Sequence, residues 1–328
     1  MASDATSRAA DSRAHPRDIT QLCYSGGGSG GWFFVGAVRA LEQIMAAHGI
    51  DLSRHIQRAA GSSVGSMIAL AHALRMSGEE LEALAAEMSI ACRGLQMNIL
   101  DLPSKHGVIS MEPIAAMVRT ILRRHLGPRG EGVTMAQLHA KTGVDLRIIV
   151  HNLTLARPET MAWDTAPDVP VWRAVCMSCA IPGLLHAQPY NGYIYVDGGC
   201  SHVFPVDEID LSHGLGFHIF GTHPIARPAD IGLADFLCRL MHSQDAAQPR
   251  RTAMLPPEHR DRIISTGVPC VTSSVLSGFA LPEATVASLI RAGRAAALTY
   301  FFRPQLQALT AACILFRIDW SRRPALRI

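Results

Sequence analysis

The chain has 328 residues, of which 48% are hydrophobic and only 17% are charged. This composition can form one large buried core, and it excludes a chain that is disordered throughout. The net charge of +3, from 30 basic and 27 acidic residues, is too small to indicate nucleic acid as a partner. The sequence therefore predicts a globular protein, and a mild attraction to anionic lipid stays open.

The first 18 residues are polar and aperiodic, and they predict a disordered tail in front of a single domain at 19–328. This tail lacks the apolar stretch of a secretory signal. The best apolar run, at 308–316, is shorter than the roughly 20 residues that span a bilayer. We therefore expect a cytoplasmic protein without a transmembrane segment, either soluble or peripheral on membranes. Its oligomeric state stays open.

Strands and helices alternate along the chain. Short apolar runs predict strands at 19–25, 57–60, 193–196 and 216–221, and a hairpin from 144–155 and 160–163. Apolar residues at helical spacing predict helices at 32–47, 66–74, 78–91, 110–125, 171–179 and 230–242. This alternation predicts an α/β fold with its core at about 20–210.

The C-terminal part, from about residue 211, is expected to contain one strand and mainly helices. Residues 244–262 are charged and contain proline, so they are a candidate surface loop or lid. Two helices are expected at 283–302 and 305–316, with a break at Pro304 because proline cannot donate a main-chain hydrogen bond.

A G-x-S-x-G pattern lies between the second strand and the helix that follows it. Gly61 and Gly65 flank Ser63, and this pattern is typical of a sharp turn that exposes a serine hydroxyl. The start of the helix at Val64 adds amide dipoles beside any oxyanion that forms there. Ser63 is therefore the candidate nucleophile, and Ser62 is the neighbouring alternative without glycine at both flanking positions.

A run of glycines follows the first strand and precedes the first long helix. Its main-chain N–H groups can converge on a negative oxygen, which predicts an anion site. The residues are Gly26, Gly27, Gly28, Ser29, Gly30 and Gly31. They also satisfy a dinucleotide-binding fingerprint, but that reading needs an acidic residue at the end of a second strand, and neither Glu42 nor Asp51 fits.

Asp197 follows the strand at 193–196 and precedes Gly198 and Gly199, so its carboxylate is expected at a strand end with little bulk around it. An Asp-Gly-Gly sequence alone is typical of an ordinary turn. The order of the three motifs is more specific, because the glycine loop is followed by G-x-S-x-G and then by Asp-Gly-Gly after a Ser-Cys-Ala-Ile-Pro segment.

In this combination the sequence resembles the patatin-like phospholipase family. The matching stretches are 25–31 with Gly36, 61–65, 177–183 and 196–205, and the resemblance covers about residues 20–210. It implies a three-layer α/β/α fold with a mostly parallel central sheet, and an enzyme that hydrolyses lipid acyl esters without metal or cofactor. Ser63 is implied as nucleophile, Asp197 as base and Gly26–Gly31 as oxyanion hole. Gly61, Gly65, Gly198 and Gly199 support them.

Two positions depart from the pattern of the family, which usually carries Lys or Arg at the position of Gly30 and asparagines near His202 and Val203. His202 is therefore a candidate accessory residue. A Ser-Asp-His triad through His202, His213, His218 or His223 also stays open. So do a catalytically weak lipid-binding or regulatory module and a dinucleotide-binding protein. The expected partner is a lipid or phospholipid at a membrane surface.

The apolar residues beside the two catalytic motifs are candidates for an acyl groove, although they are equally typical of plain core. These residues are Val64, Met67, Ile181 and Leu184. Cysteines are expected to be reduced thiols, since the Cys176-x-x-Cys179 pair has no second pair or histidine cluster to complete a zinc site.

Overall fold

The computed structural model describes residues 15–93, 95–222, 227–231, 236, 239–240, 243, 252–269 and 281–315. The tail predicted at 1–18 lies outside these residues except for its last four positions. There Pro16–Asp18 form one turn (η1) in which Pro16 is buried, so the folded chain starts before residue 19. Much of the helix predicted at 230–242 and of the candidate lid also lies outside them.

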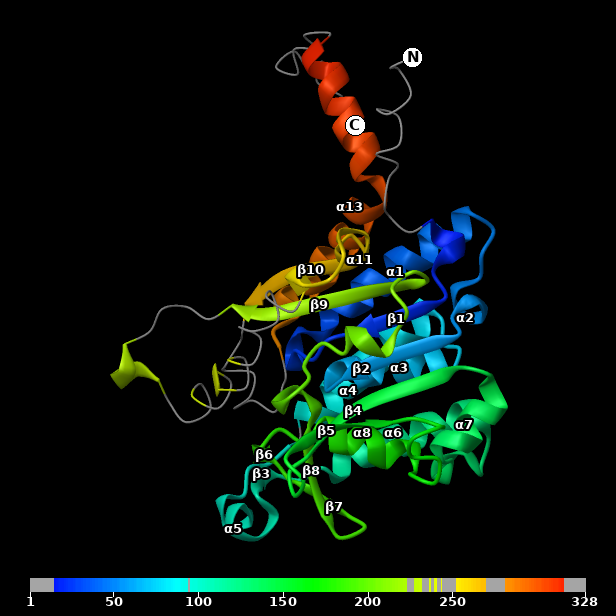
Figure 1. The fold of residues 1–328 in the computed structure, drawn as a ribbon. Coiled ribbons are helices and arrows are strands. Elements are labelled where there is room, and N and C mark those ends of the chain that lie inside the picture. The colour runs from blue at the N-terminus through cyan, green and yellow to red at the C-terminus, as the bar shows by residue number, and fades with distance from the viewer. Residues whose placement is uncertain are drawn as a thin grey trace.

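A mainly parallel sheet forms the centre of the molecule (Figure 1). Five strands run parallel in the order β10-β9-β1-β2-β4, and β8 and β7 extend the β4 edge in the antiparallel sense. β5 also pairs with β4, as the predicted hairpin requires. Their bounds are β1 Gln21–Tyr24, β2 Arg58–Ser62, β4 Asp145–Asn152, β5 Arg157–Met161, β7 Gln188–Tyr190, β8 Tyr193–Asp197, β9 Gly214–Thr222 and β10 Ile263–Pro269.

The helices connect these strands, and the predicted fold class, a mixed α/β protein with a central sheet, is confirmed. A separate small sheet pairs β3 (Gly107–Ile109) with β6 (Gly183–Leu185) in parallel. The helices are α1 Trp32–Ala47, α2 Leu52–His55, α3 Val64–Ala73, α4 Gly78–Arg93, α5 Leu102–Lys105, α6 Glu112–Leu126, α7 Met135–Thr142, α8 Val171–Ser178, α11 Pro257–Arg260 and α13 Glu283–Leu315.

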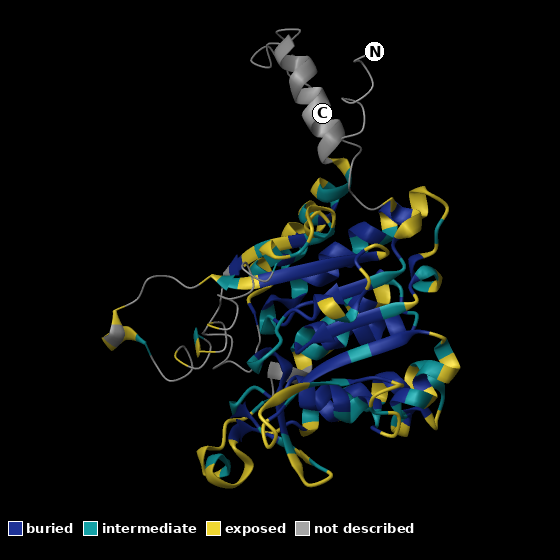
Figure 2. Cartoon of the chain, viewed as in Figure 1, coloured by how far each residue is buried: buried dark blue, intermediate teal, exposed yellow. Residues whose placement is uncertain are grey.

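The core lies on both faces of the sheet but is much larger on one of them. Because side chains alternate along β1, Leu22 and Tyr24 join a core shared with α1, α3, α4, α6 and α8. Cys23 points to the opposite face, where Phe204 and its neighbours up to Leu211 form a smaller cluster. Figure 2 shows the resulting pattern, with buried strands and helices whose outer sides are exposed.

Close packing of two helices holds the end of the described chain against its beginning. A side chain at Gly36 of α1 would collide with the main chain of Ile290 in α13, and one at Gly293 would collide with the main chain of Phe33. The predicted break at Pro304 is wrong, since α13 continues to Leu315. Proline removes one helical hydrogen bond, but its φ is compatible with a helix, so the helix can pass through it.

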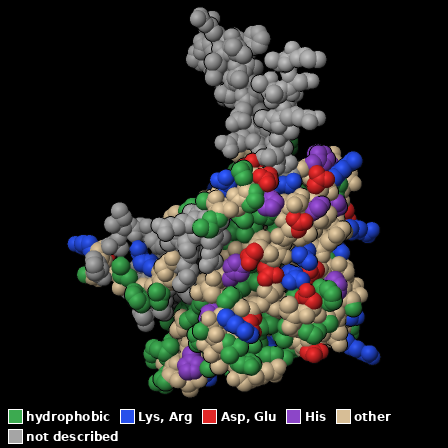
Figure 3. Space-filling view, viewed as in Figure 1, with side chains coloured by type: hydrophobic (Ala, Val, Ile, Leu, Met, Phe, Trp, Pro, Cys, Tyr) green, Lys and Arg blue, Asp and Glu red, His purple; other side chains and the backbone are tan. Residues whose placement is uncertain are grey.

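Charged side chains of both signs are interspersed on the face of the molecule shown in Figure 3. Arg147 is the centre of one such group, with contacts to Asp145 at 3.1 Å, Asp164 at 2.8 Å and Glu208 at 3.3 Å. Among the residues that the structure describes, we find no helix with the length and apolar character to cross a membrane.

Two buried histidines are expected to make the stability depend on pH. His72 contacts the Tyr24 hydroxyl at 2.8 Å, and His218 contacts the Ser265 hydroxyl at 2.9 Å. Burial lowers the pKa of each to about 4, and nearby Arg75 lowers that of His72 further. The unfolded chain takes up these protons near pH 6.5, whereas the folded protein stays neutral at both sites until about pH 4.

The free energy of unfolding should therefore be fully available above about pH 6.5 and should fall as the pH drops toward 4. The expected loss between pH 7 and pH 5 is about 2 kcal/mol for each histidine. Urea unfolding at pH 7, 6 and 5 measures it, and a His218→Gln variant should show about half the dependence. Equal dependence in the variant and the wild type would contradict this account.

Candidate active site

Ser63 lies on a strained turn between β2 and α3. Its φ of 53° and ψ of −128° are unusual for a residue with a side chain, and α3 begins at the next residue. The flanking glycines allow this turn. A Cβ at Gly61 would collide with the main chain of Gly65, and one at Gly65 would collide with the main-chain oxygens of Tyr24 and Ser25. The serine is 8% exposed, so it borders the interior.

The register of three strands brings Asp197 to the same level as Ser63. Ser62 pairs with Ile149 across β2 and β4, and Val150 pairs with Asp197 across β4 and β8. β4 therefore separates the two segments by one strand only. Residues 134 positions apart in the chain are placed side by side in this way.

The Ser63 hydroxyl donates a hydrogen bond to the Asp197 carboxylate, with 2.7 Å between Oγ and Oδ2. The other carboxylate oxygen, Oδ1, accepts the N–H of Gly199 at 2.8 Å, which fixes the orientation of the group. Asp197 is only 1% exposed. A carboxylate within this distance of a serine hydroxyl is placed to accept its proton.

Ser178 orients the nucleophile turn, and the sequence reasoning did not identify it. Its hydroxyl accepts the N–H of Ser63 at 2.9 Å and donates to the carbonyl of Ile149 at 2.6 Å. This residue ends α8 and begins the Ser-Cys-Ala-Ile-Pro segment. That segment was the available signal, but only the structure brings it under Ser63.

The glycine loop lies beside Ser63, but two of its amides are already used. The N–H of Gly26 donates to the carbonyl of Val203 at 2.8 Å, and that of Gly30 donates to the carbonyl of Gly27 at 2.9 Å. These two are therefore unsuited to bind an oxyanion, contrary to the expectation for the whole loop. The N–H groups of Gly27 and Gly28 have no hydrogen-bond partner among the described residues, and Gly28 lines the cavity at Ser63.

The loop has no room for the basic side chain that the family usually carries at position 30. A Cβ at Gly30 would approach the Ile219 side chain to 2.9 Å and the Val268 side chain to 3.2 Å. Glycine at this position is therefore a consequence of close packing against β9 and β10. Any stabilisation of a charged intermediate by this loop must come from main-chain amides.

The candidate histidines contact other partners. His202 contacts Asp207 at 2.6 Å instead of Asp197, and His213 contacts Asp210 at 3.1 Å. His218 is buried against Phe204 and contacts Ser265, and His223 lies outside the described residues. No hydrogen bond joins any of the three described histidines to Ser63 or Asp197, so the structure gives no support to a triad through them.

Two other sequence-level alternatives have structural explanations. Glu42 accepts the N–H of Gly78, and Asp51 caps α2 by accepting the N–H of Ser53, so neither lies at a strand end as a dinucleotide site requires. Burial raises the pKa of Cys176 to about 12, which keeps this thiol of the Cys-x-x-Cys pair protonated. Burial and the charge of Asp197 do the same for Cys200.

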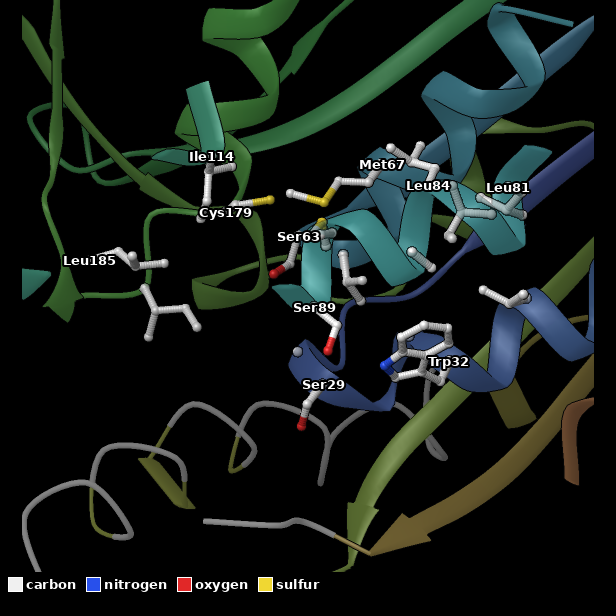
Figure 4. Close-up of a pocket in the computed structure, with 18 residues that line it drawn as sticks. Ser29, Trp32, Ser63, Met67, Leu81, Leu84, Ser89, Ile114, Cys179 and Leu185 are labelled. Atoms are coloured by element: carbon white, nitrogen blue, oxygen red, sulfur yellow. The ribbon is translucent and has the colours of Figure 1, made fainter. Parts of the chain in front are cut away.

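A cavity with about 900 Å³ of empty space, including its open mouth, extends from Ser63 (Figure 4). α4 and the small β3-β6 sheet supply walls that the sequence reasoning missed. Val64, Met67 and Ile181 line the cavity as predicted, whereas Leu185 replaces the predicted Leu184. The close-up shows Met67, Leu81 and Leu84 on one side of Ser63 and Ile114 and Leu185 on the other. Apart from Ser29, Ser63 and Ser89, its walls are glycines and apolar side chains.

A family model described as patatin-like phospholipase matches residues 22–210, which is more than half of the chain. The chain belongs to the patatin-like phospholipase family. The matched region begins in β1 and ends after Asp197, so it contains the glycine loop, the serine turn and the Asp-Gly-Gly motif in the order that the sequence showed.

Relatives within and beyond this patatin-like family have names that concern lipids. The chain is 25% identical over 194 residues to "Probable lipid hydrolase 463L" of Invertebrate iridescent virus 6, covering 58% of this chain and 63% of that protein. It is 27% identical over 229 residues to "Triacylglycerol lipase ptl2" of Schizosaccharomyces pombe, covering 64% of this chain but 34% of the lipase. The chain thus spans less than two thirds of either relative.

Solved structures share the patatin-like fold at low sequence identity. VipD from Legionella pneumophila matches with a TM-score of 0.52 and 14% identity, over 86% of this chain and 66% of that one. The ExoU chain of the ExoU-SpcU complex from Pseudomonas aeruginosa matches with a TM-score of 0.50 and 19% identity, over 87% of this chain and 52% of that one. At such identities the likeness concerns the fold alone.

Proposed function

We propose that this protein is a lipid acyl hydrolase of the phospholipase A type, with Ser63 as nucleophile and Asp197 as base. The observation that carries the proposal is the 2.7 Å hydrogen bond between Ser63 and Asp197 at the edge of an apolar cavity. Membership of the family and the lipid-related names of its relatives support the substrate class. The cavity would hold the acyl chain, with its carbonyl carbon next to Ser63 Oγ.

The reaction would proceed through a covalent acyl-enzyme. Asp197 accepts the Ser63 proton as Oγ attacks the ester carbonyl, and the carbonyl oxygen becomes a tetrahedral oxyanion. The protonated Asp197 then gives its proton to the leaving alcohol oxygen as the ester bond breaks. In the second half, Asp197 takes a proton from water, whose oxygen attacks the acyl carbonyl. Ser63 recovers its proton when the fatty acid leaves.

Main-chain amides would stabilise the oxyanion. Gly27 and Gly28 supply N–H groups without a described partner, and Val64 supplies the N–H at the start of α3, which no residue of the same helix can accept. One such donor typically contributes about 10²- to 10³-fold in rate. This set is narrower than the expected Gly26–Gly31, and it needs no cationic side chain at position 30.

The test is fatty-acid release from vesicles, measured by mass spectrometry together with labelling by a fluorophosphonate. The vesicles contain phosphatidylcholine, an anionic phospholipid, a lysophospholipid or a triacylglycerol, and flotation reports whether the protein binds their surface. We expect release and labelling in the wild type, and neither in Ser63→Ala. Identified products would also name the ester position and head group.

Ser62→Ala is the matched control. Ser62 is fully buried, its hydroxyl has no hydrogen-bond partner among the described residues, and it does not line the cavity. This variant should keep both activity and labelling. Lipid binding without any release or labelling would instead favour the catalytically weak lipid-binding module.

A further inference from the structure

A second cavity lies beyond the one at Ser63. It contains about 290 Å³ of empty space between α3, α4 and α6, and we call it the inner cavity. Met67, Leu84 and Met88 line both cavities, so these three side chains form the wall between them. Every other side chain that lines the inner cavity is also apolar. An apolar cavity of this kind stays free of water and accepts hydrocarbon.

The two cavities follow one face of α3. Val64, Met67 and Ile68 line the first cavity, and Met67, Leu70, Ala71 and Leu74 line the inner one. These positions recur every three or four residues, as a single helix face requires. At a rise of 1.5 Å per residue, Leu74 lies about 16 Å along the helix axis from Ser63. That length suits a long acyl chain lying along the helix.

The wall between the cavities can open without movement of the main chain. Methionine has three rotatable bonds in an unbranched side chain, and two of the three wall residues, Met67 and Met88, are methionines. Both side chains are only partly buried, whereas Leu84 is 9% exposed. A change of methionine rotamer would join the two spaces into one channel.

We propose that the inner cavity binds the methyl end of long acyl chains, and that Met67 and Met88 form a gate between it and the Ser63 cavity. This inference rests on the proposed lipid acyl hydrolase function. It makes the inner cavity a determinant of chain-length specificity. Each methylene that enters should raise kcat/KM about fourfold, from the free energy of burying one methylene.

The test compares kcat/KM for 4-nitrophenyl butyrate and 4-nitrophenyl palmitate, below their micelle concentrations. In Ala71→Leu the added side chain fills the inner cavity from α3, and in Val118→Phe it does so from α6. We expect the palmitate-to-butyrate ratio to fall at least tenfold in both variants. Because this ratio is taken within one protein sample, partial loss of folded protein cancels.

The control variant is Ala86→Leu, which adds the same volume as Ala71→Leu on an exposed position of α4 that lines neither cavity. It should keep the wild-type ratio. If Ala71→Leu and Val118→Phe also keep that ratio, the inner cavity is a packing defect and the proposal is overturned.

Binding separates this proposal from the proposed function. Calorimetry in the Ser63→Ala background measures the affinity for palmitate and octanoate, with and without Ala71→Leu. We expect Ala71→Leu to weaken palmitate binding at least tenfold more than octanoate binding, and equal weakening would overturn the inference. Absence of ester hydrolysis in the wild type would overturn the proposed function alone, because the binding ratio would still decide the role of the inner cavity.

Discussion

Asp197→Asn is expected to lower kcat about 10³- to 10⁴-fold while the protein stays folded. Asp197 Oδ1 accepts the N–H of Gly199, so the asparagine oxygen should keep this position. Its NH₂ group would then face Ser63 Oγ, where it can donate a hydrogen bond but cannot take a proton. The geometry would survive and the base would be lost. Release of fatty acid from the vesicles described above measures the effect.

Asp207→Asn is the matched control for this change. Asp207 contacts His202 on the exposed side of the same segment and does not contact Ser63. It should change kcat less than threefold, a small fraction of the loss expected for a general base. A loss in Asp207→Asn comparable to that in Asp197→Asn would instead implicate His202, and would revive a role for histidine in the reaction.

The sequence predicted the parts of the site that depend on local geometry. A turn that exposes Ser63 needs small residues on both sides, so glycines at 61 and 65 mark it without knowledge of the rest of the fold. The strand before Asp197 was also predicted from its apolar run. Their meeting across β4 depends on strand register, and the resemblance to the family supplied that expectation.

The cavity walls could not be predicted in the same way. Leu81, Leu84 and Met88 have the helical spacing of an ordinary core helix, and nothing in this pattern distinguishes a wall beside empty space from a filled core. Leu185 instead of Leu184 lines the cavity because neighbouring residues of β6 point to opposite faces. An error of one residue in strand position therefore exchanges the two side chains.

The loop amides illustrate a further limit of the sequence. Six consecutive small residues predict an anion site, but main-chain partners decide which of their N–H groups remain available. The carbonyl of Val203, far along the chain, accepts the N–H of Gly26. Close packing against Ile219 explains why Gly30 differs from the usual basic residue. Both facts depend on distant segments.

Gly65→Ala is expected to abolish activity and to destabilise the protein by about 3 kcal/mol or more, the range found when extra atoms are forced into a packed interior. The new methyl group would collide with the main-chain oxygens of Tyr24 and Ser25 at the end of β1. Main-chain atoms cannot rotate away as a side chain can. α3 would have to move from β1, and Ser63, at the start of α3, would move with it away from Asp197. Urea unfolding and fluorophosphonate labelling measure the two effects.

Gly132→Ala separates this collision from the general effect of replacing glycine. A Cβ at Gly132 meets no atom within 4 Å, and its main chain needs no positive φ. We expect its free energy of unfolding to change by less than about 1 kcal/mol and its labelling to match the wild type. If Gly65→Ala is as stable and as readily labelled as Gly132→Ala, the close approach of α3 to β1 is not what holds the nucleophile in place. The strained φ of Ser63 would then have to be maintained by the hydrogen bond from its N–H to Ser178 alone.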